Sequence, residues 1–231
     1  MKNSSVLVLG GHLDDSIIAV GGIIKKMINA GCQVSVVCFG NGNEGFAHIE
    51  DQNTCVKKFT SEAIKAHKIL GVSDFVCHNY PDFGVQMSQE TYRLCIEAIR
   101  RVKPDIIFGH YFREYFQHHA MAKLTTDAWY QAGWECSADL GKPHQAKRVY
   151  HYEVLQLLPD PTHLVDISDT LQDKLNAWDC FVTGQEHLGS LRSQIEARAR
   201  YYGSLLGVKY AEALIQSHFI PEKVINPVTE L

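Results

Sequence analysis

The chain has 231 residues, of which 45% are hydrophobic and 21% charged, and its net charge is −4. This composition is typical of a globular protein with a substantial core, and it argues against a nucleic-acid-binding surface. Its apolar runs have the length of strands, so we expect no membrane-spanning helix. Seven scattered cysteines without a Cys-x-x-Cys pair indicate reduced thiols and a cytoplasmic protein. We interpret residues 1–231 as a single domain, because no linker or repeat divides them.

Apolar and amphipathic segments alternate along the first 133 residues, and glycines follow several of the amphipathic ones. In chain order, the pattern predicts a strand within 5–12, a helix over 15–30, a strand over 33–39, a helix over 54–70, a strand over 74–79, a helix over 88–102, a strand over 105–109 and a helix over 120–132. This alternation indicates an α/β fold of the Rossmann-like, doubly wound kind, with a mostly parallel sheet flanked by helices. The remaining residues are interpreted as a small C-terminal elaboration.

Polar segments follow the predicted strands. They read GHLDD, GNGNEG, YPDFG and GHYFREYFQHH. Ligands of open α/β sheets bind beyond the carboxyl ends of the strands, so we expect these four segments to meet at one rim.

The first of these segments places a histidine and two adjacent carboxylates directly after a strand. His12 and Asp15 can be aimed at one point by a turn, and His118 or His119 can supply a third ligand for a divalent metal. Asp14 would then remain free to act as a general base on water. Helix capping is the competing interpretation, because Asp15 can cap a helix and Asp14 can favour its dipole. Residue spacing alone leaves both interpretations open.

With these motifs in place, the sequence resembles the PIG-L/LmbE-like family of zinc-dependent N-deacetylases. The similarity lies in VLVLGGHLDDSIIAVGGIIKK, in NGNEG with SEAIKAHKILGV and YPD, in YFQHHAMAKLTTDAWYQAG, and in RVYHYE with VDISDTLQDKLNAWDCFVTGQE and YAEAL. The last segment is most similar to the branch that deacetylates N-acetylglucosaminyl malate in bacillithiol synthesis. The resemblance implies an LmbE-like fold for the whole chain.

The resemblance also implies roles for individual residues. His12 and Asp15 match metal ligands, and Asp14 matches the general base. His118 matches the third ligand when the downstream AKL, DA and AG are aligned, whereas His119 takes that place in a competing register. The expected cofactor is Zn²⁺, although Fe²⁺ also suits such ligands.

Several positions depart from the family pattern or complete it. Tyr115 stands where the family has the first histidine of its H-P-D-H motif, and Gln117 stands where it has the aspartate. A tyrosine hydroxyl can donate a hydrogen bond to an oxyanion, so Tyr115 is a candidate catalytic residue. Asp82 matches a position that contacts the sugar. His110 and Arg113 are further candidates for substrate binding.

The expected function is hydrolysis of the N-acetyl group of an N-acetylglucosamine-type amino sugar or its glycoside. Two alternatives remain open, namely an amidase for another N-acyl substrate, such as a nucleoside or an antibiotic-type sugar, and a sugar-binding homologue with weakened catalysis. The resemblance implies a homo-oligomer, a trimer or a hexamer, and no nucleic-acid or membrane partner.

Overall fold

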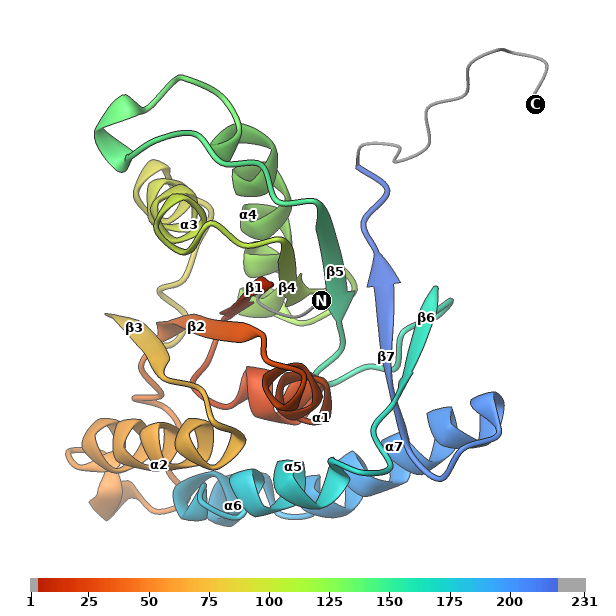
Figure 1. Cartoon of the computed structure of the whole chain (residues 1–231). Coiled ribbons are helices and arrows are strands. Elements are labelled where there is room, and N and C mark those ends of the chain that lie inside the picture. The colour runs from red at the N-terminus through yellow and green to blue at the C-terminus, as the bar shows by residue number, and fades with distance from the viewer. Residues whose placement is uncertain (1–3, 220–231) are drawn as a thin grey trace.

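The computed structural model describes residues 4–219, which form a sheet of seven strands with helices on both faces (Figure 1). The strands are β1 (Ser5–Gly10), β2 (Gln33–Gly40), β3 (Asp74–Tyr80), β4 (Ile106–His110), β5 (Arg148–Tyr152), β6 (His163–Asp166) and β7 (Ala211–Gln216). The helices are α1 (Asp15–Asn29), α2 (Cys55–Leu70), α3 (Gln89–Val102), α4 (Phe116–Ala132), α5 (Leu171–Trp178), α6 (Val182–Leu188) and α7 (Leu191–Leu206). None of these helices is long and apolar enough to span a membrane.

The sheet has the strand order β3-β2-β1-β4-β5-β7-β6. The first five strands in this order are parallel to their neighbours, whereas β7 runs antiparallel to both β5 and β6. The predicted α/β class with a mostly parallel sheet is therefore confirmed. The antiparallel strands and the last three helices form the C-terminal elaboration.

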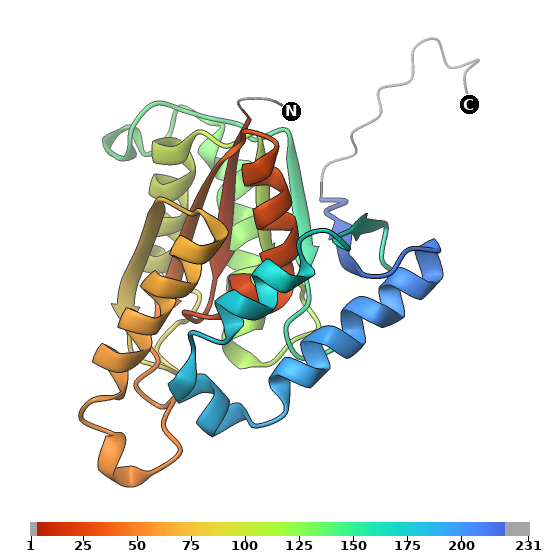
Figure 2. The same ribbon diagram turned by 60° about the horizontal axis from the view of Figure 1, so that its bottom comes forward.

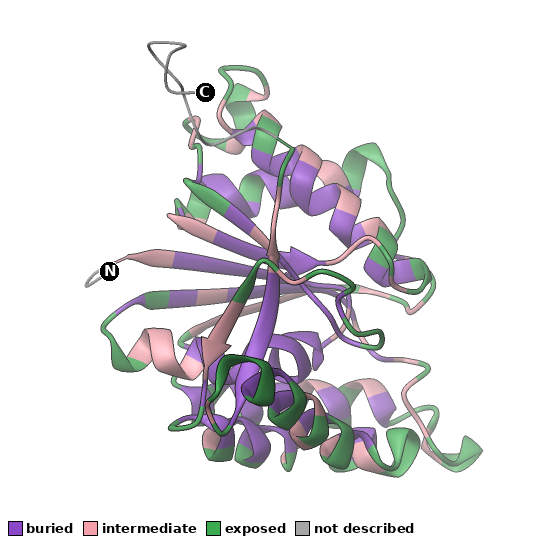
Figure 3. Ribbon diagram, turned by 90° about the vertical axis from the view of Figure 1, so that its right-hand side faces the viewer, coloured by how far each residue is buried: buried purple, intermediate pink, exposed green. Residues whose placement is uncertain are grey.

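The alternation within β1 explains why the sheet is covered on both faces. Val6 and Val8 belong to the core cluster that also contains α1, α2 and α5 residues, whereas Leu7 and Leu9 belong to the cluster beneath α3 and α4. Successive side chains of a strand point to opposite faces, so a fully apolar strand requires a helix layer on each side. Figure 3 shows the resulting layer of buried strands between the helices.

The C-terminal helices lie across the α1–α2 face (Figure 2). A buried ion pair helps to attach them, since Lys174 Nζ lies 2.6 Å from Glu212 Oε1. The Glu212 carboxylate also accepts hydrogen bonds from the backbone N–H groups of Gly22 and Ile23. Helix α1 is interrupted at Val20, whose φ and ψ are −127° and 21°, so Glu212 satisfies amides close to this interruption.

Most predicted element bounds agree with the structure to within one or two residues, but helix α4 does not. It begins at Phe116, four residues before the predicted start, so His118 lies in its first turn rather than in a loop. The error arose because this turn buries polar side chains, Gln117 and His118, instead of apolar ones. Hydrophobic periodicity cannot detect a helical turn of that kind.

Candidate metal centre

The segment between β1 and α1 forms a tight turn that points Asp15 back at the preceding backbone. Asp15 Oδ2 accepts a hydrogen bond of 2.6 Å from the His12 N–H. Asp14 is the N-cap residue of α1, yet its side chain makes no capping hydrogen bond. A capping hydrogen bond therefore does not explain the carboxylate of Asp14.

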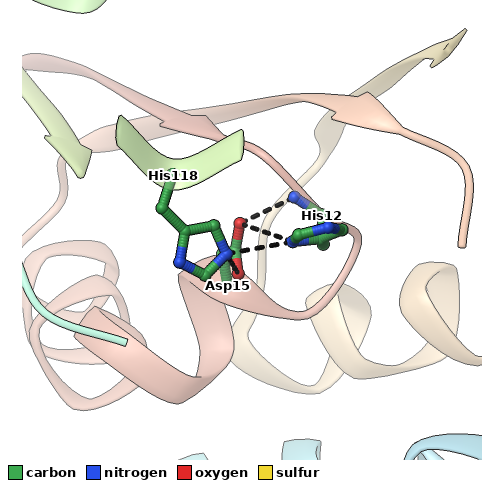
Figure 4. A group of neighbouring side chains, drawn as sticks. All are labelled: His12, Asp15 and His118. Carbon is green, nitrogen blue, oxygen red and sulfur yellow. Dashed lines mark hydrogen bonds and ion pairs between the residues drawn. The ribbon is translucent and has the colours of Figure 1, made fainter. Parts of the chain in front are cut away.

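His12, Asp15 and His118 come together at the carboxyl edge of the sheet (Figure 4). His12 Nδ1 lies 3.0 Å from His118 Nε2, and His118 Nε2 lies 3.3 Å from Asp15 Oδ1. One ligand atom from each of the three residues lies within 4.8 Å of the others. Two imidazole nitrogens and a carboxylate oxygen are a donor set that suits Zn²⁺ with an open coordination position, and Fe²⁺ also accepts it. The residues present therefore fit a divalent metal.

The structure brings His118, and not its neighbour, to this cluster. His119 is exposed, and its Nδ1 lies 2.7 Å from the carbonyl oxygen of Phe112. The two histidines are adjacent on a helix, so their side chains point about 100° apart around its axis. Only one of them can therefore face the site.

Glu114 supports His118 and was not predicted from the sequence. Its Oε2 lies 3.2 Å from His118 Nδ1, the nitrogen opposite the proposed ligand atom. Its Oε1 accepts hydrogen bonds from the N–H groups of Val154 and Leu155, both at 2.8 Å. The carboxylate thus orients the imidazole and ties it to the segment after β5. No local pattern predicted this contact, because Glu114 precedes the N-cap residue Tyr115 and so does not share a helix face with His118.

Gln117, which stands at the aspartate position of the family motif and was given no predicted role, is also buried. Its Nε2 lies 3.1 Å from His12 Nε2, and its Oε1 accepts a hydrogen bond from the Phe83 N–H. This side chain connects the metal cluster to the loop after β3.

The predicted substrate contacts of His110 and Arg113 do not agree with the structure. His110 is completely buried, and its Nε2 lies 2.9 Å from Asp15 Oδ2, so it supports a candidate metal ligand from behind. Arg113 is exposed and does not line the cavity described below. Both predictions relied on proximity in the sequence, whereas His110 is buried at the end of β4 and Arg113 is exposed in the loop that follows.

Asp82 and Tyr115 do lie at the cavity. Asp82 accepts hydrogen bonds from the N–H groups of Gly42 and Glu44, at 3.2 and 3.0 Å, and so shapes the loop after β2. Gly42 has a φ of 73°, and a Cβ atom there would collide with Phe59. The Tyr115 hydroxyl lies 3.3 Å from His12 Nε2.

The environment separates the two adjacent aspartates electrostatically. Burial and the neighbouring Asp15 raise the pKa of Asp14 above its ordinary value. Burial alone would raise the pKa of Asp15, but the charges and hydrogen bonds of His118 and His110 hold it well below its ordinary value. Asp15 thus remains an ionised ligand, whereas Asp14 can take up a proton more readily.

These residues lie at one side of a cavity of about 550 Å³, within the roughly 300–1,000 Å³ typical of small-molecule sites. The cavity is lined by His12, Asp14, Asp15, Ile18, Gly42, Glu44, Gly45, Phe59, Asp82, Phe83, Tyr115, His118, Val154, Leu155, Gly184, His187, Leu188, Leu191 and Gln194. Loops at the sheet edge form one side, and the segment after β5 together with α6 and α7 forms the other.

Known proteins of similar sequence and structure include sugar deacetylases. A diacetylchitobiose deacetylase from Thermococcus kodakarensis is 26% identical over 235 residues, which cover 94% of this chain and 83% of that protein. The crystallised N,N'-diacetylchitobiose deacetylase from Pyrococcus horikoshii superposes with a TM-score of 0.84 at 21% identity, covering 98% of this chain and 88% of that one. GalB from Pseudomonas putida, a 4-carboxy-2-hydroxymuconate hydratase, superposes with a TM-score of 0.80 at 24% identity over 98% and 99% of the two chains.

The hydratase shows that this fold also carries other chemistry, so the fold alone does not define an activity. The narrower similarity to the branch that acts on N-acetylglucosaminyl malate stays a prediction. The family itself is established by a sequence model described as GlcNAc-PI de-N-acetylase, which matches residues 7–129. Because this match covers more than half of the chain, the protein belongs to the PIG-L family.

Proposed function

We propose that the protein is a metal-dependent N-deacetylase that acts on N-acetylglucosamine-type amino sugars or their glycosides. The observation that carries this proposal is the cluster of His12, Asp15 and His118 in the cavity, with Asp14 beside it. Family membership and the sugar deacetylases among its relatives support the same reaction.

In this proposal, His12 Nδ1, His118 Nε2 and the Asp15 carboxylate hold the divalent ion, with Zn²⁺ as the expected metal and Fe²⁺ as the alternative. When bound, the ion supplies Lewis acidity to the amide carbonyl and to the attacking water. Glu114 and His110 keep two of the three ligands in position.

Asp14 acts as the general base. It lines the cavity, is almost fully buried, and is not one of the three ligands. Its carboxylate accepts a proton as water attacks the acetyl carbon. The same proton is passed to the sugar nitrogen when the C–N bond breaks, so the products are acetate and the free amine.

Tyr115 donates a hydrogen bond to the oxygen that becomes negative during the attack. Burial and the carboxylates of Asp15 and Asp82 raise its pKa to about 12, so its hydroxyl keeps its proton at neutral pH. Asp82, on the loop after β3, accepts a hydrogen bond from a sugar hydroxyl. We also expect a trimer or hexamer, as the family resemblance implies, and a cytoplasmic location, as the scattered cysteines indicate.

The direct test is acetate release from N-acetylglucosamine and its simple glycosides by the metal-loaded protein, with a chelated sample as the control. We expect turnover that disappears on metal removal and returns with Zn²⁺. If acyl groups are released only from N-acyl nucleosides or antibiotic-type sugars, the proposed substrate is wrong and the alternative amidase function takes its place. Binding of the sugars without any acetate release would instead identify a non-catalytic homologue.

A further inference from the structure

The cavity has an apolar wall that comes from segments far apart in the chain. It consists of Ile18, Phe59, Phe83, Leu155, Leu188 and Leu191. Three of its large side chains remain considerably exposed, namely Phe83 at 57%, Leu155 at 55% and Leu188 at 39%. Exposed apolar side chains that gather around one cavity indicate a ligand with apolar surface to bury.

Apart from the histidines, the ionisable side chains with charge at the cavity are acidic. Among residues 4–219, no lysine or arginine lines it, whereas Asp14, Asp15, Glu44 and Asp82 do. A divalent ion at the metal cluster would offset Asp14 and Asp15. Glu44 and Asp82 lie on the loops after β2 and β3 and would remain uncompensated.

Two nearby cationic groups do not line the cavity. Lys58 Nζ lies 2.6 Å from Asp51 Oδ1. Arg198 is mostly buried, and its Nη1 donates a hydrogen bond of 2.5 Å to the carbonyl oxygen of Val154, which places it behind the wall. An anionic group on the aglycone would therefore lose its water without meeting a lysine or arginine side chain, and such burial is costly.

We propose that the substrate is an N-acetylglucosamine-type glycoside whose aglycone is uncharged and apolar, of the aryl or alkyl kind. This inference rests on the proposed deacetylase function and specifies its substrate class. The apolar wall favours such an aglycone, and the carboxylates of Glu44 and Asp82 disfavour one that carries carboxylates. The malyl aglycone of the bacillithiol branch is thereby disfavoured.

Three glycosides of N-acetylglucosamine test this proposal, because they share the sugar and differ only in the aglycone. They carry a methyl, a phenyl or a 4-carboxyphenyl group. We expect kcat/KM for the phenyl glycoside to exceed both others by about tenfold, a difference that a single change in an apolar pocket can produce. Equilibrium binding of the three glycosides, measured by calorimetry with the Zn²⁺-loaded Asp14→Asn variant to prevent turnover, should follow the same order.

A substitution in the wall should abolish the charge preference. Leu155→Arg places a cation in the wall, at a side chain exposed enough to accept it. Leu157→Arg is the matched control, because Leu157 is 51% exposed in the same segment but does not line the cavity. We expect L155R to raise the ratio of carboxyphenyl to phenyl kcat/KM by about tenfold, and L157R to leave that ratio unchanged.

The outcomes separate this inference from the proposed function. Equal or better turnover of the 4-carboxyphenyl glycoside, or the same ratio change in both variants, would overturn the inference and leave the deacetylase function standing. Acetate release from none of the three would overturn the deacetylase function. In that case, tighter binding of the phenyl glycoside would still support the apolar preference, and equal binding of all three would remove it.

Discussion

The two sides of the cavity are built in different ways. The side that holds the candidate metal centre uses one turn after β1 and the first turn of α4, where directional hydrogen bonds with Glu114 and His110 hold the proposed ligands. The apolar wall takes single side chains from segments that extend from α1 to α7, and their contribution is surface area rather than direction.

This difference separates two kinds of sensitivity to mutation. A ligand or a general base must have one chemical group at one place, so its loss removes a function that no neighbour can supply. A wall residue contributes apolar contact that its neighbours partly share. Substitutions on the metal side should therefore act on chemistry, and substitutions in the wall on substrate affinity.

The largest effect is expected for His118→Ala. Loss of a ligand should weaken metal binding by more than the roughly 10–100-fold that loss of a supporting residue costs, and activity should disappear with it. Competition with a chelating indicator measures the affinity. His119→Ala is the matched control and should behave like the wild-type protein, because His119 points away from the cluster. The reverse result would assign the ligand to His119.

Asp14→Asn should lower kcat by roughly 10²–10⁴ while metal stoichiometry is retained, since general base catalysis contributes about that much. Steady-state acetate release and metal analysis of the same preparation would measure both quantities. A variant that keeps full activity with its metal bound would show that Asp14 is not the base.

Glu114→Gln tests the support of the metal side. The side-chain oxygen of the glutamine can still accept hydrogen bonds from the backbone N–H groups after β5. Its NH₂ group, however, cannot accept one from His118 Nδ1–H. We expect metal affinity to fall by roughly 10–100-fold, as for other supporting carboxylates. Glu97→Gln is a suitable control on the exposed surface of α3. Equal metal affinity of both variants would show that Glu114 only positions the segment after β5.

The smallest effect is expected from the wall. Leu188→Ala should raise KM roughly threefold to tenfold without lowering kcat, since it removes apolar contact that is equal in the ground and transition states. Leu206→Ala, which is 46% exposed but outside the cavity, should change neither constant. A fall in kcat for Leu188→Ala would contradict the division between the two sides.

The sequence by itself determined the layered core and the site's first motif. The apolar run that becomes β1 requires cover on both faces, and a turn after it can present His12, Asp14 and Asp15 only at the carboxyl edge of the sheet. These features depend on residue type and on local spacing, which the sequence records directly.

The tertiary structure alone decided the rest. The early start of α4 directs His118 to the metal cluster, the end of β4 carries His110 behind Asp15, and Glu114 reaches amides about 40 residues further along. The apolar wall likewise exists only once α6 and α7 fold back over the sheet edge. These relations join residues distant in the chain, and such pairings follow from how the elements pack, which no local pattern encodes.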